Sequence, residues 1–346
     1  MITIRKLHNQ LIIKKIHLFL VLLSPALLLV FNGCQQAQTS PYLYVQGEAQ
    51  GTTYTVVYID EEKRDISAEL IEILKDVDLS LSTYRPDSYI SKWNQNEAPD
   101  TLDRHFKTMI ELSATLHQLS AGYFDPTIEP LSQFYGFEKQ QAHPNQNIDS
   151  ILSYVGFSKL DIQAHQILKK DKRMQLNFNA IAQGYTVDLM AEFLISKGIK
   201  DFFVELGGEV YMSGKKANQQ KWTVGIEKPE AERVDSFQDK VYLSDFAITT
   251  SGSYRKWKIN QENGKKISHT INPKTGQNQV KTLISASIIN PNCALADGLS
   301  TVLMNFDKTQ AEDFLSKHPF PALLIFSEDG KTTVNYYNGF QNFMTP

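Results

Sequence analysis

The sequence predicts an α+β fold, in which helices pack on a mixed or antiparallel sheet. Three observations predict it: helical periodicity recurs in separate segments, a series of strand-like runs follows, and no internal repeat or Pro/Ser-rich linker occurs after residue 50. The 346 residues are 42% apolar, which is enough to bury a large core. We therefore expect a single domain, with a two-lobed arrangement as the alternative.

The first part of the domain predicts a strand followed by three helices. "GTTYTVVYI" (51–59) alternates well enough for a strand. "DISAELIEILKDVDLSLSTY" (65–84) and "RHFKTMIELSATLHQLSAG" (104–122) repeat apolar residues at helical spacing. "AIAQGYTVDLMAEFLISKG" (180–198) predicts a third helix, which ends at its terminal glycine.

The second part of the domain is rich in strand-like runs. A helix that contains Asp297 is expected between the last two of them. The predicted strands are "DFFVELGG" (201–208), "KWTVGIE" (221–227), "VYLSDFAITTSG" (241–252), "TLISASII" (282–289) and "ALLIFS" (322–327).

The charge balance argues against a nucleic-acid partner. The formal net charge is −3, and no long run of like charge appears. Binding to a phosphate backbone needs a basic field, which this composition does not supply.

The N-terminus predicts a lipoprotein signal. Basic residues precede an apolar run at 18–31, which is shorter than the ~20 residues that span a bilayer. The run ends in "VFNGC", and Gly33 followed by Cys34 resembles the lipobox of bacterial lipoproteins, in which the cysteine is lipidated. We expect a signal peptide at 1–33, a lipidated polar tether at 34–44 and the domain at 45–346, in the bacterial cell envelope facing the periplasm. The alternative is an uncleaved membrane anchor.

Cysteine usage shows that the fold does not depend on disulfides. The chain has two cysteines, and acylation of Cys34 leaves Cys293 without a partner within the chain. Beside Ala294 and Ala296, Cys293 is expected to be a small buried hydrophobe without a catalytic role.

Asp297 is the residue that most needs explanation. It interrupts the small, apolar run "CALADGLSTVLM" (293–304), and Thr301 follows one helical turn later. A carboxylate buried without a partner costs several kcal/mol, so a cation or a hydrogen-bond donor should meet it. Either a metal ion faces Asp297 and Thr301, or these side chains bond to the backbone or to each other.

Seven motifs in order resemble those of the FAD:protein FMN transferase family, ApbE. Each is weak alone, but together they cover nearly all of the chain after the N-terminal segment. The motifs are "STYRPDSYIS" (82–91), "GYFDPTIEP" (122–130), "NAIAQGYTVD" (179–188), "VELGGEV" (204–210), "TTSGSY" (249–254), "HTINPKTG" (269–276) and "CALADGLST" (293–301).

The resemblance implies transfer of the FMN half of FAD to a Thr or Ser of an exported acceptor protein, with release of AMP and use of Mg²⁺. Asp297 and Thr301 would ligate Mg²⁺ together with the backbone carbonyl of Ala180; hard oxygen ligands suit this ion. The alternatives are a flavin-binding lipoprotein, or a Mg²⁺-dependent FAD pyrophosphatase that modifies no protein. A purely structural lipoprotein would have no use for the Asp297/Thr301 pair beside a histidine.

The resemblance also implies FAD contacts in loops. Tyr84 and the run Tyr123, Phe124 and Asp125 match flavin-nucleotide contacts of the family, and neighbouring Pro, Gly and Asp residues place them in loops. Gln50 matches a contact that is often made by Met.

Further FAD contacts are implied at Asn177, Gln183 and the backbone of Ile271. The family commonly has Asp and Lys at the first two positions, so this chain lacks a pair of opposite charges there. Asn and Gln can still form hydrogen bonds to a nucleotide. His269 is the expected catalytic residue, because an imidazole beside the phosphates could accept the acceptor's hydroxyl proton.

Overall fold

A computed structural model describes residues 40–97, 99, 101–137, 147–229, 237–253, 257–259, 266–278 and 281–346. Cys34, the expected signal peptide and most of the expected tether lie outside these residues. The first strand begins at Tyr42, so the domain starts three residues before the expected boundary at 45. No helix among the described residues is long and apolar enough to cross a membrane.

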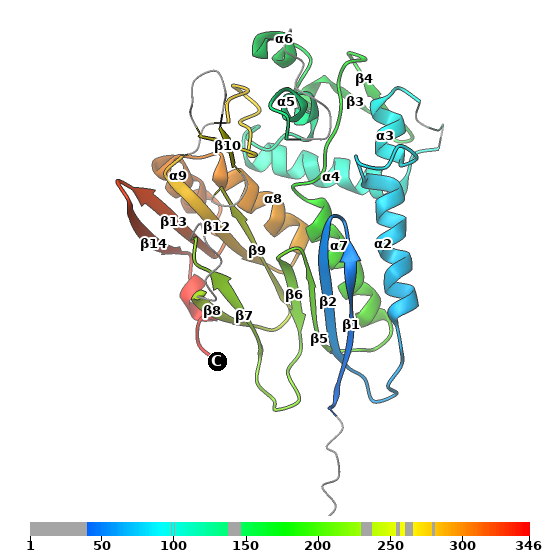
Figure 1. Cartoon of the computed structure of the whole chain (residues 1–346), viewed down its shortest axis with the longest axis vertical. Helices are drawn as coiled ribbons and strands as arrows, with labels where there is room; N and C mark the ends of the chain where they lie inside the picture. The colour runs from blue at the N-terminus through cyan, green and yellow to red at the C-terminus, as the bar shows by residue number, and fades with distance from the viewer. Residues whose placement is uncertain are drawn as a thin grey trace, which may run out of the picture. The chain divides into compact units, whose positions relative to one another are not determined.

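The unit Tyr42–Pro346 is built on an eight-stranded sheet with the order β1-β2-β5-β6-β9-β12-β13-β14 (Figure 1). Every neighbouring pair in it is antiparallel. Its strands are β1 (Tyr42–Ala49), β2 (Thr52–Ile59), β5 (Asp201–Leu206), β6 (Glu209–Ser213), β9 (Phe246–Gly252), β12 (Leu283–Asn290), β13 (Ala322–Glu328) and β14 (Lys331–Tyr337).

Three hairpins lie outside this sheet, and each pairs its two strands antiparallel. They are formed by β3 (Leu160–Ile162) with β4 (Ile167–Lys169), by β7 (Trp222–Glu227) with β8 (Phe237–Leu243), and by β10 (Trp257–Ile259) with β11 (Lys266–Ser268).

The helices described are a mixture of long α-helices and short turns. They are α2 (Ser67–Leu81), α3 (Tyr89–Asn94), α4 (Arg104–Leu119), α5 (Glu129–Phe134), α6 (Ile148–Leu152), α7 (Ala182–Ser196), α8 (Cys293–Met304) and α9 (Lys308–Lys317), with 3₁₀ turns η1 (Pro126–Ile128), η2 (Phe157–Lys159) and η3 (Phe340–Phe343).

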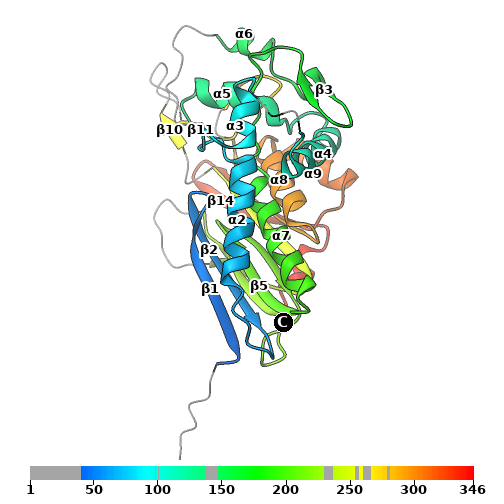
Figure 2. The ribbon, with the colours of Figure 1, turned by 90° about the vertical axis from the view of Figure 1, so that its right-hand side faces the viewer.

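Helices α2, α7 and α8 cover one face of the sheet (Figures 1 and 2). Apolar residues of α2 and α7, such as Leu70 and Met190, share one buried cluster with Val56 and Val204 of the sheet. Residues of α8, such as Leu299, pack with β12 in a second cluster. Helix α8 is therefore enclosed between the sheet and the other helices, which explains why its sequence is small and apolar.

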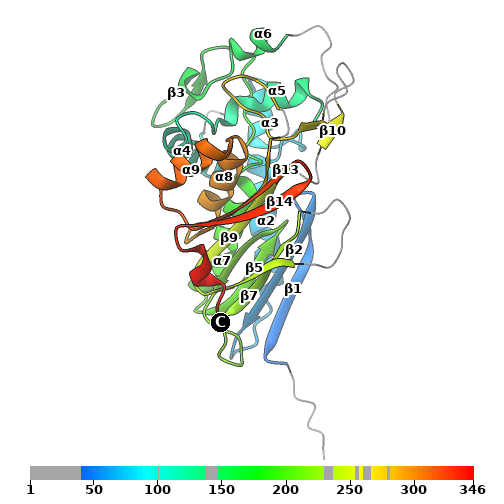
Figure 3. The ribbon, with the colours of Figure 1, turned by 90° about the vertical axis from the view of Figure 1, so that its left-hand side faces the viewer.

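The opposite face of the sheet is partly covered by the β7–β8 hairpin and η3 (Figure 3). Trp222 and Val241 from the hairpin and Phe340 from η3 pack against Ile248 and Leu323 of the sheet. Both faces of the central strands are therefore buried.

The predicted fold class is confirmed, and the three long predicted helices correspond to α2, α4 and α7. The run 241–252 was expected to be one strand, which is wrong. Strand β8 ends at Leu243 and β9 begins at Phe246, because the chain turns through Asp245, whose φ is +63°. Asp and Asn tolerate this left-handed conformation better than most residues do.

Candidate functional site

Asp297 lies where α7 and α8 touch. Its side chain is buried, and its Oδ2 accepts a hydrogen bond of 3.1 Å from the backbone N–H of Gly184. Gly184 allows this approach, because a Cβ there would lie 2.7 Å from the carbonyl oxygen of Cys293 and 2.9 Å from the Cβ of Asp297. The absence of a side chain at residue 184 thus brings a backbone donor to the buried carboxylate.

The environment of Asp297 disfavours its negative charge. Burial raises the pKa of Asp297 well above its usual range, and the nearby Glu209 and Asp188 raise it further. The hydrogen bond from Gly184 acts in the opposite direction but does not offset the burial. The carboxyl of Asp297 is therefore favoured in its neutral form unless a positive charge, such as a cation, lies beside it.

Thr301 follows Asp297 by one turn of α8 and faces strand β9. Its Oγ1 lies 3.3 Å from Ser251 Oγ, which in turn lies 2.7 Å from Ser300 Oγ. Ser300 Oγ donates to the carbonyl oxygen of Asp297 at 2.8 Å. The hydroxyl of Thr301 is therefore held at the boundary between α8 and the sheet.

Ala180 lies two residues before the start of α7, and Ile181 between them is the N-cap of the helix. The N–H of Tyr185 donates to the carbonyl of Ile181 at 3.0 Å, which continues the helical pattern. The preceding N–H, that of Gly184, is directed to Asp297 instead. Gly184 lies in the first turn of α7, where N–H groups have no acceptor within the helix, so this donor is available to Asp297. The carbonyl of Ala180 stays a predicted ligand.

Two strand connections meet the first turns of α7: the β1–β2 turn at Gln50, and the β5–β6 turn beside Gln183, which is itself in α7. Gln50 has a φ of +52° in the β1–β2 turn, and its Nε2 donates to Thr186 Oγ1 at 2.8 Å. Gln183 lies close to the β5–β6 turn, where a Cβ on Gly207 would be 3.0 Å from its Nε2. Both predicted FAD contacts therefore lie around the start of α7, as does Ala180.

Asp188, which the sequence analysis did not single out, anchors the N-terminus of α8. Its two carboxylate oxygens accept hydrogen bonds from the N–H groups of Cys293 and Ala294 at 2.8 and 2.9 Å. Burial raises the pKa of Asp188 to about 7, although these two bonds lower it. Asp188 and Gly184 together fix the position of α8 against α7. Cys293 is fully buried, as expected, and burial raises the pKa of its thiol.

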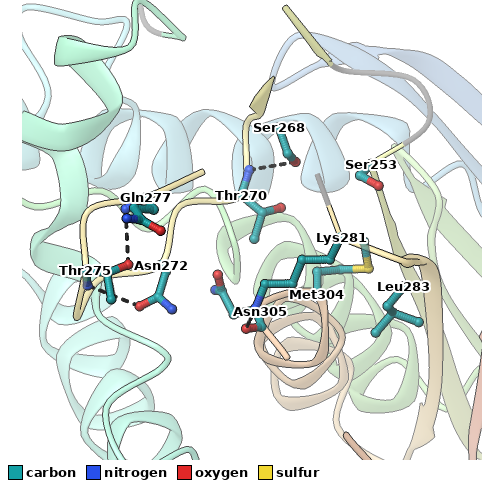
Figure 4. Close-up of a pocket in the computed structure, with 10 residues that line it drawn as sticks. All are labelled: Ser253, Ser268, Thr270, Asn272, Thr275, Gln277, Lys281, Leu283, Met304 and Asn305. Atoms are coloured by element: carbon teal, nitrogen blue, oxygen red, sulfur yellow. Dashed lines mark hydrogen bonds between the residues drawn. The ribbon is translucent and has the colours of Figure 1, made fainter. Parts of the chain in front are cut away.

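A polar cavity of about 200 Å³ lies at the other end of α8 (Figure 4). Met304 and Asn305 from the end of α8 line it, together with Lys281, Ser253 and the loop that follows β11. His269 is exposed and lies in that loop, between two residues that line the cavity. The lining residues are Ser253, Ser268, Thr270, Asn272, Thr275, Gln277, Lys281, Leu283, Met304 and Asn305.

Tyr123 lies close to this cavity. Its carbonyl accepts a 3.4 Å hydrogen bond from Asn305 Nδ2, and its ring packs edge-on against Phe306 with a centroid distance of 4.8 Å. The ammonium of Lys274, from the loop of His269, lies 4.2 Å from the centre of the same ring. The predicted FAD contact Tyr123 and the predicted catalytic residue His269 are thus brought to the same region by α8 and the 269–276 loop.

The side chains of Phe124 and Asp125 are buried in the protein interior. Phe124 is 4% exposed and belongs to the main apolar cluster. The carboxylate of Asp125 accepts bonds from the N–H and hydroxyl of Thr127 at 2.9 and 2.6 Å, and from the N–H of Phe157 at 2.7 Å. Their side chains therefore hold the loop in place, and the backbone of the loop is the part that can meet a ligand.

The three other predicted contacts differ in exposure. Asn177 Nδ2 donates to Glu129 Oε2 at 2.6 Å, which ties the segment before α7 to α5. Ile271 is 2% exposed and packs beside Leu131, so a ligand could meet only its backbone. Tyr84 is 50% exposed in the loop between α2 and α3.

A model of the ApbE family matches residues 50–324 of this chain. The chain belongs to the ApbE family. The FAD:protein FMN transferase of Vibrio cholerae is 29% identical over 319 residues, which are 89% of this chain and 94% of that protein. The FAD:protein FMN transferase of Salmonella typhimurium is 29% identical over 345 residues, or 94% and 95% of the two chains.

Solved structures of ApbE proteins share this fold. The flavin transferase ApbE from Vibrio cholerae superposes with a TM-score of 0.78 at 28% identity, over 88% of this chain and 99% of that one. The apo form of the Pseudomonas stutzeri flavinyl transferase ApbE gives a TM-score of 0.78 at 27% identity, over 88% and 97%. The ApbE fold is therefore established for this chain over nearly the whole unit Tyr42–Pro346.

The ApbE chain presents suitable oxygen donors for a hard divalent cation. They are the buried carboxylate of Asp297 at the contact of α7 and α8, the hydroxyl of Thr301 at the boundary of α8 and β9, and the carbonyl of Ala180 shortly before α7. Within the described residues, no group of three or more His, Cys, Asp or Glu side chains could hold a metal. Mg²⁺ requires no such group, because it binds through one or two carboxylates plus water and phosphate oxygens.

The sequence analysis did not single out the residues that position the candidate ligands Asp297 and Thr301. These residues are Gly184, Asp188 and Ser251. An isolated glycine in the first turn of a predicted helix is an unusual feature that signals close packing. Asp188 interrupts an apolar helical run in the same way as Asp297 does. Ser251 lies in the motif "TTSGSY", but the sequence gave it no role, because its contact with Thr301 joins residues that are 50 positions apart.

Proposed function

We propose that this protein is a Mg²⁺-dependent FAD:protein FMN transferase. It transfers the FMN moiety of FAD to a Thr or Ser of an exported acceptor protein and releases AMP. The observation that carries the proposal is the buried carboxylate of Asp297 beside the Thr301 hydroxyl, in a chain that belongs to the ApbE family. Relatives named FAD:protein FMN transferase over almost the same length support it.

Asp297, Thr301 and the Ala180 carbonyl would hold the Mg²⁺. When bound, the cation offsets the negative charge of the FAD pyrophosphate. Gly184 donates to Asp297 and so orients one carboxylate oxygen, while Asp188 fixes the start of the helix that carries both side-chain ligands. The burial of these groups keeps their geometry rigid before substrate arrives.

The flavin nucleotide would lie between the start of α7 and the loops that carry Tyr123 and His269. Gln50 and Gln183 offer amide groups on the α7 side, and Tyr84 offers an exposed ring. The loop at 123–125, Asn177 and the backbone of Ile271 would complete the contacts. Because Phe124 and Asp125 are held internally, the loop presents a fixed backbone to the ligand.

His269 would accept the proton of the acceptor hydroxyl. The hydroxyl oxygen forms a bond to the phosphorus of the FMN half, the pyrophosphate P–O bond breaks, and AMP leaves with the bonding electrons. His269 is exposed in a loop beside the polar cavity, so a segment of another protein can reach it. Proton removal by a positioned base typically contributes ~10² to 10⁴ in rate.

We further propose that the chain is a lipoprotein that is anchored to the membrane through Cys34 and faces the periplasm. The order of the N-terminal features supports this: basic residues, the apolar run 18–31 and then Gly33-Cys34. Each acyl CH₂ contributes about 0.8 kcal/mol in a bilayer, so several acyl chains hold a folded domain firmly.

Incubation of the protein with FAD, Mg²⁺ and a candidate acceptor tests the transferase proposal. Such an acceptor is a secreted domain that carries FMN on Thr or Ser when isolated from its own cells. We expect the acceptor to gain the mass of FMN less one water, and AMP to appear in equal amount. AMP release with an unmodified acceptor would indicate a pyrophosphatase, and FAD binding without turnover would indicate a flavin-binding protein.

A further inference from the structure

The hydroxyl groups of Ser300 and Ser251 connect the backbone of α8 to the side chain of Thr301. Ser300 Oγ lies 2.8 Å from the carbonyl oxygen of Asp297, and Ser251 Oγ lies 2.7 Å from Ser300 Oγ. Thr301 Oγ1 lies 3.3 Å from Ser251 Oγ. The chain of contacts thus runs from helix α8 to strand β9 and back to α8.

Counting protons sets the direction of every bond in this chain. A carbonyl oxygen can only accept, so the single proton of the Ser300 hydroxyl is used at Asp297. The proton between Ser251 and Ser300 must then come from Ser251. With that proton used, the proton between Thr301 and Ser251 must come from Thr301.

We propose that Ser251 is a positioning residue for the proposed metal site, because it directs the Thr301 proton toward β9. A hydroxyl has one proton and two acceptor lone pairs, so the lone pairs of Thr301 are left facing away from Ser251 and available to a cation. The hydroxyl of Thr301 is therefore oriented so that its lone pairs, and not its proton, face the proposed cation. This inference rests on the proposed function, since it concerns the same Mg²⁺ site.

Groups that orient a metal ligand without touching the metal have a measurable effect. Their replacement typically weakens metal binding about 10- to 100-fold. Thr301 contributes a neutral and weak ligand, so the effect of Ser251 should be near the lower limit. We expect Ser251→Ala to weaken Mg²⁺ binding about tenfold.

Ser300 provides a sharper test of proton direction. Ser300→Ala removes neither the proposed ligands nor the Ser251–Thr301 contact. It does free the proton of Ser251, which can then point to Thr301 and turn the Thr301 proton toward the cation. We therefore expect Ser300→Ala to weaken Mg²⁺ binding as well, although Ser300 is a step further from the metal.

The sheet offers a matched control on its opposite face. Thr250, the neighbour of Ser251 in β9, pairs its hydroxyl with Ser287 Oγ at 2.7 Å. Ser287 is fully buried in β12, as Ser300 is in α8. Ser287→Ala thus removes one buried hydroxyl with the same hydrogen-bond length, but on the side away from α8.

The experiment is a titration of the full chain with MgCl₂ by calorimetry, together with thermal unfolding with and without Mg²⁺. The variants are Ser251→Ala, Ser300→Ala and Ser287→Ala, with Ser251→Thr to restore the hydroxyl. We expect all three alanine variants to lose some stability without metal. Only Ser251→Ala and Ser300→Ala should weaken Mg²⁺ binding, and Ser251→Thr should recover it.

Two results would overturn the inference. Unchanged Mg²⁺ affinity in Ser251→Ala and Ser300→Ala would show that proton direction does not matter, and an equal loss in Ser287→Ala would show a general loosening of the sheet. Failure of the proposed metal site itself is distinguishable, because the unaltered protein would then show no Mg²⁺ binding at all.

Discussion

Replacing Gly184 with alanine tests whether the contact of α7 and α8 builds the site. The added methyl would lie 2.7 Å from the Cys293 carbonyl oxygen, 2.9 Å from Ala294 Cα and 2.9 Å from Asp297 Cβ. Carbon atoms pack at roughly 3.5 Å or more, so the helices would have to separate by about 0.6 Å. These three neighbours are backbone or Cβ atoms, which cannot rotate away.

Two opposing effects determine the size of the change. Overpacking a close-packed interior costs about 1–3 kcal/mol, and the rigid neighbours of Gly184 place this site near the upper value. Alanine favours a helix over glycine by about 1 kcal/mol. We therefore expect a net loss of about 2 kcal/mol in the free energy of unfolding, and a Tm lower by roughly 3 °C.

Thermal unfolding and Mg²⁺ titration check the prediction together. Separation of the helices also lengthens the 3.1 Å bond from Gly184 to Asp297, so Mg²⁺ binding should weaken as well. Ser196→Ala, on an exposed position of the last turn of α7, is the control and should change stability by less than about 0.5 kcal/mol. A Gly184→Ala protein that is as stable as the original or more stable, with unchanged Mg²⁺ affinity, would refute the reasoning.

Four other variants test separate parts of the account. Asp297→Asn keeps an oxygen for the Gly184 N–H but removes the negative charge. The fold should therefore remain, and calorimetry should show much weaker Mg²⁺ binding. An unchanged Mg²⁺ affinity would show that the carboxylate has only a structural role. His269→Ala should bind FAD normally and transfer FMN about 10²- to 10⁴-fold more slowly in single-turnover assays, and an unchanged rate would remove His269 from the reaction. The Asp188 carboxyl ionises near its ordinary pKa when unfolded but at about 7 when folded, so it should make stability fall as pH rises from about 4 to about 7. Asp188→Asn should remove that slope in denaturant titrations, and a slope that persists would contradict this. Cys34→Ser should move the protein from the membrane to the soluble fraction, whereas unchanged fractionation without an N-terminal acyl mass would contradict lipid anchoring.

Much of the fold follows from local patterns in the sequence. The apolar spacing of the segments at α2, α4 and α7 predicted these helices within a few residues at each end. Strand β14 was missed because its residues are partly exposed and polar, as in "KTTVNYY", so no apolar alternation marks it. The turn at Asp245 was missed because it lies between two apolar runs and contains neither Gly nor Pro.

The sequence predicted those parts of the site that depend on the chemistry of a single residue, but not those that depend on packing. Asp297 stood out because a carboxylate in an apolar helix needs a partner, and the structure confirms that it is buried. The Gly184 donor and the hydroxyls of Ser251 and Ser300 could not be derived, since they depend on how α7, α8 and β9 pack. Likewise, Phe124 and Asp125 matched a ligand motif, but only the structure shows that their side chains serve the interior.

The most direct test of the central claim is intact-mass analysis of an acceptor protein after reaction with FAD and Mg²⁺. A secreted acceptor that carries FMN on Thr or Ser in its own cells is the probe, and AMP is measured in the same sample. The account predicts a mass gain equal to FMN less one water, one AMP for each modified acceptor, and loss of both with Asp297→Asn. An acceptor of unchanged mass, with or without AMP release, would contradict it.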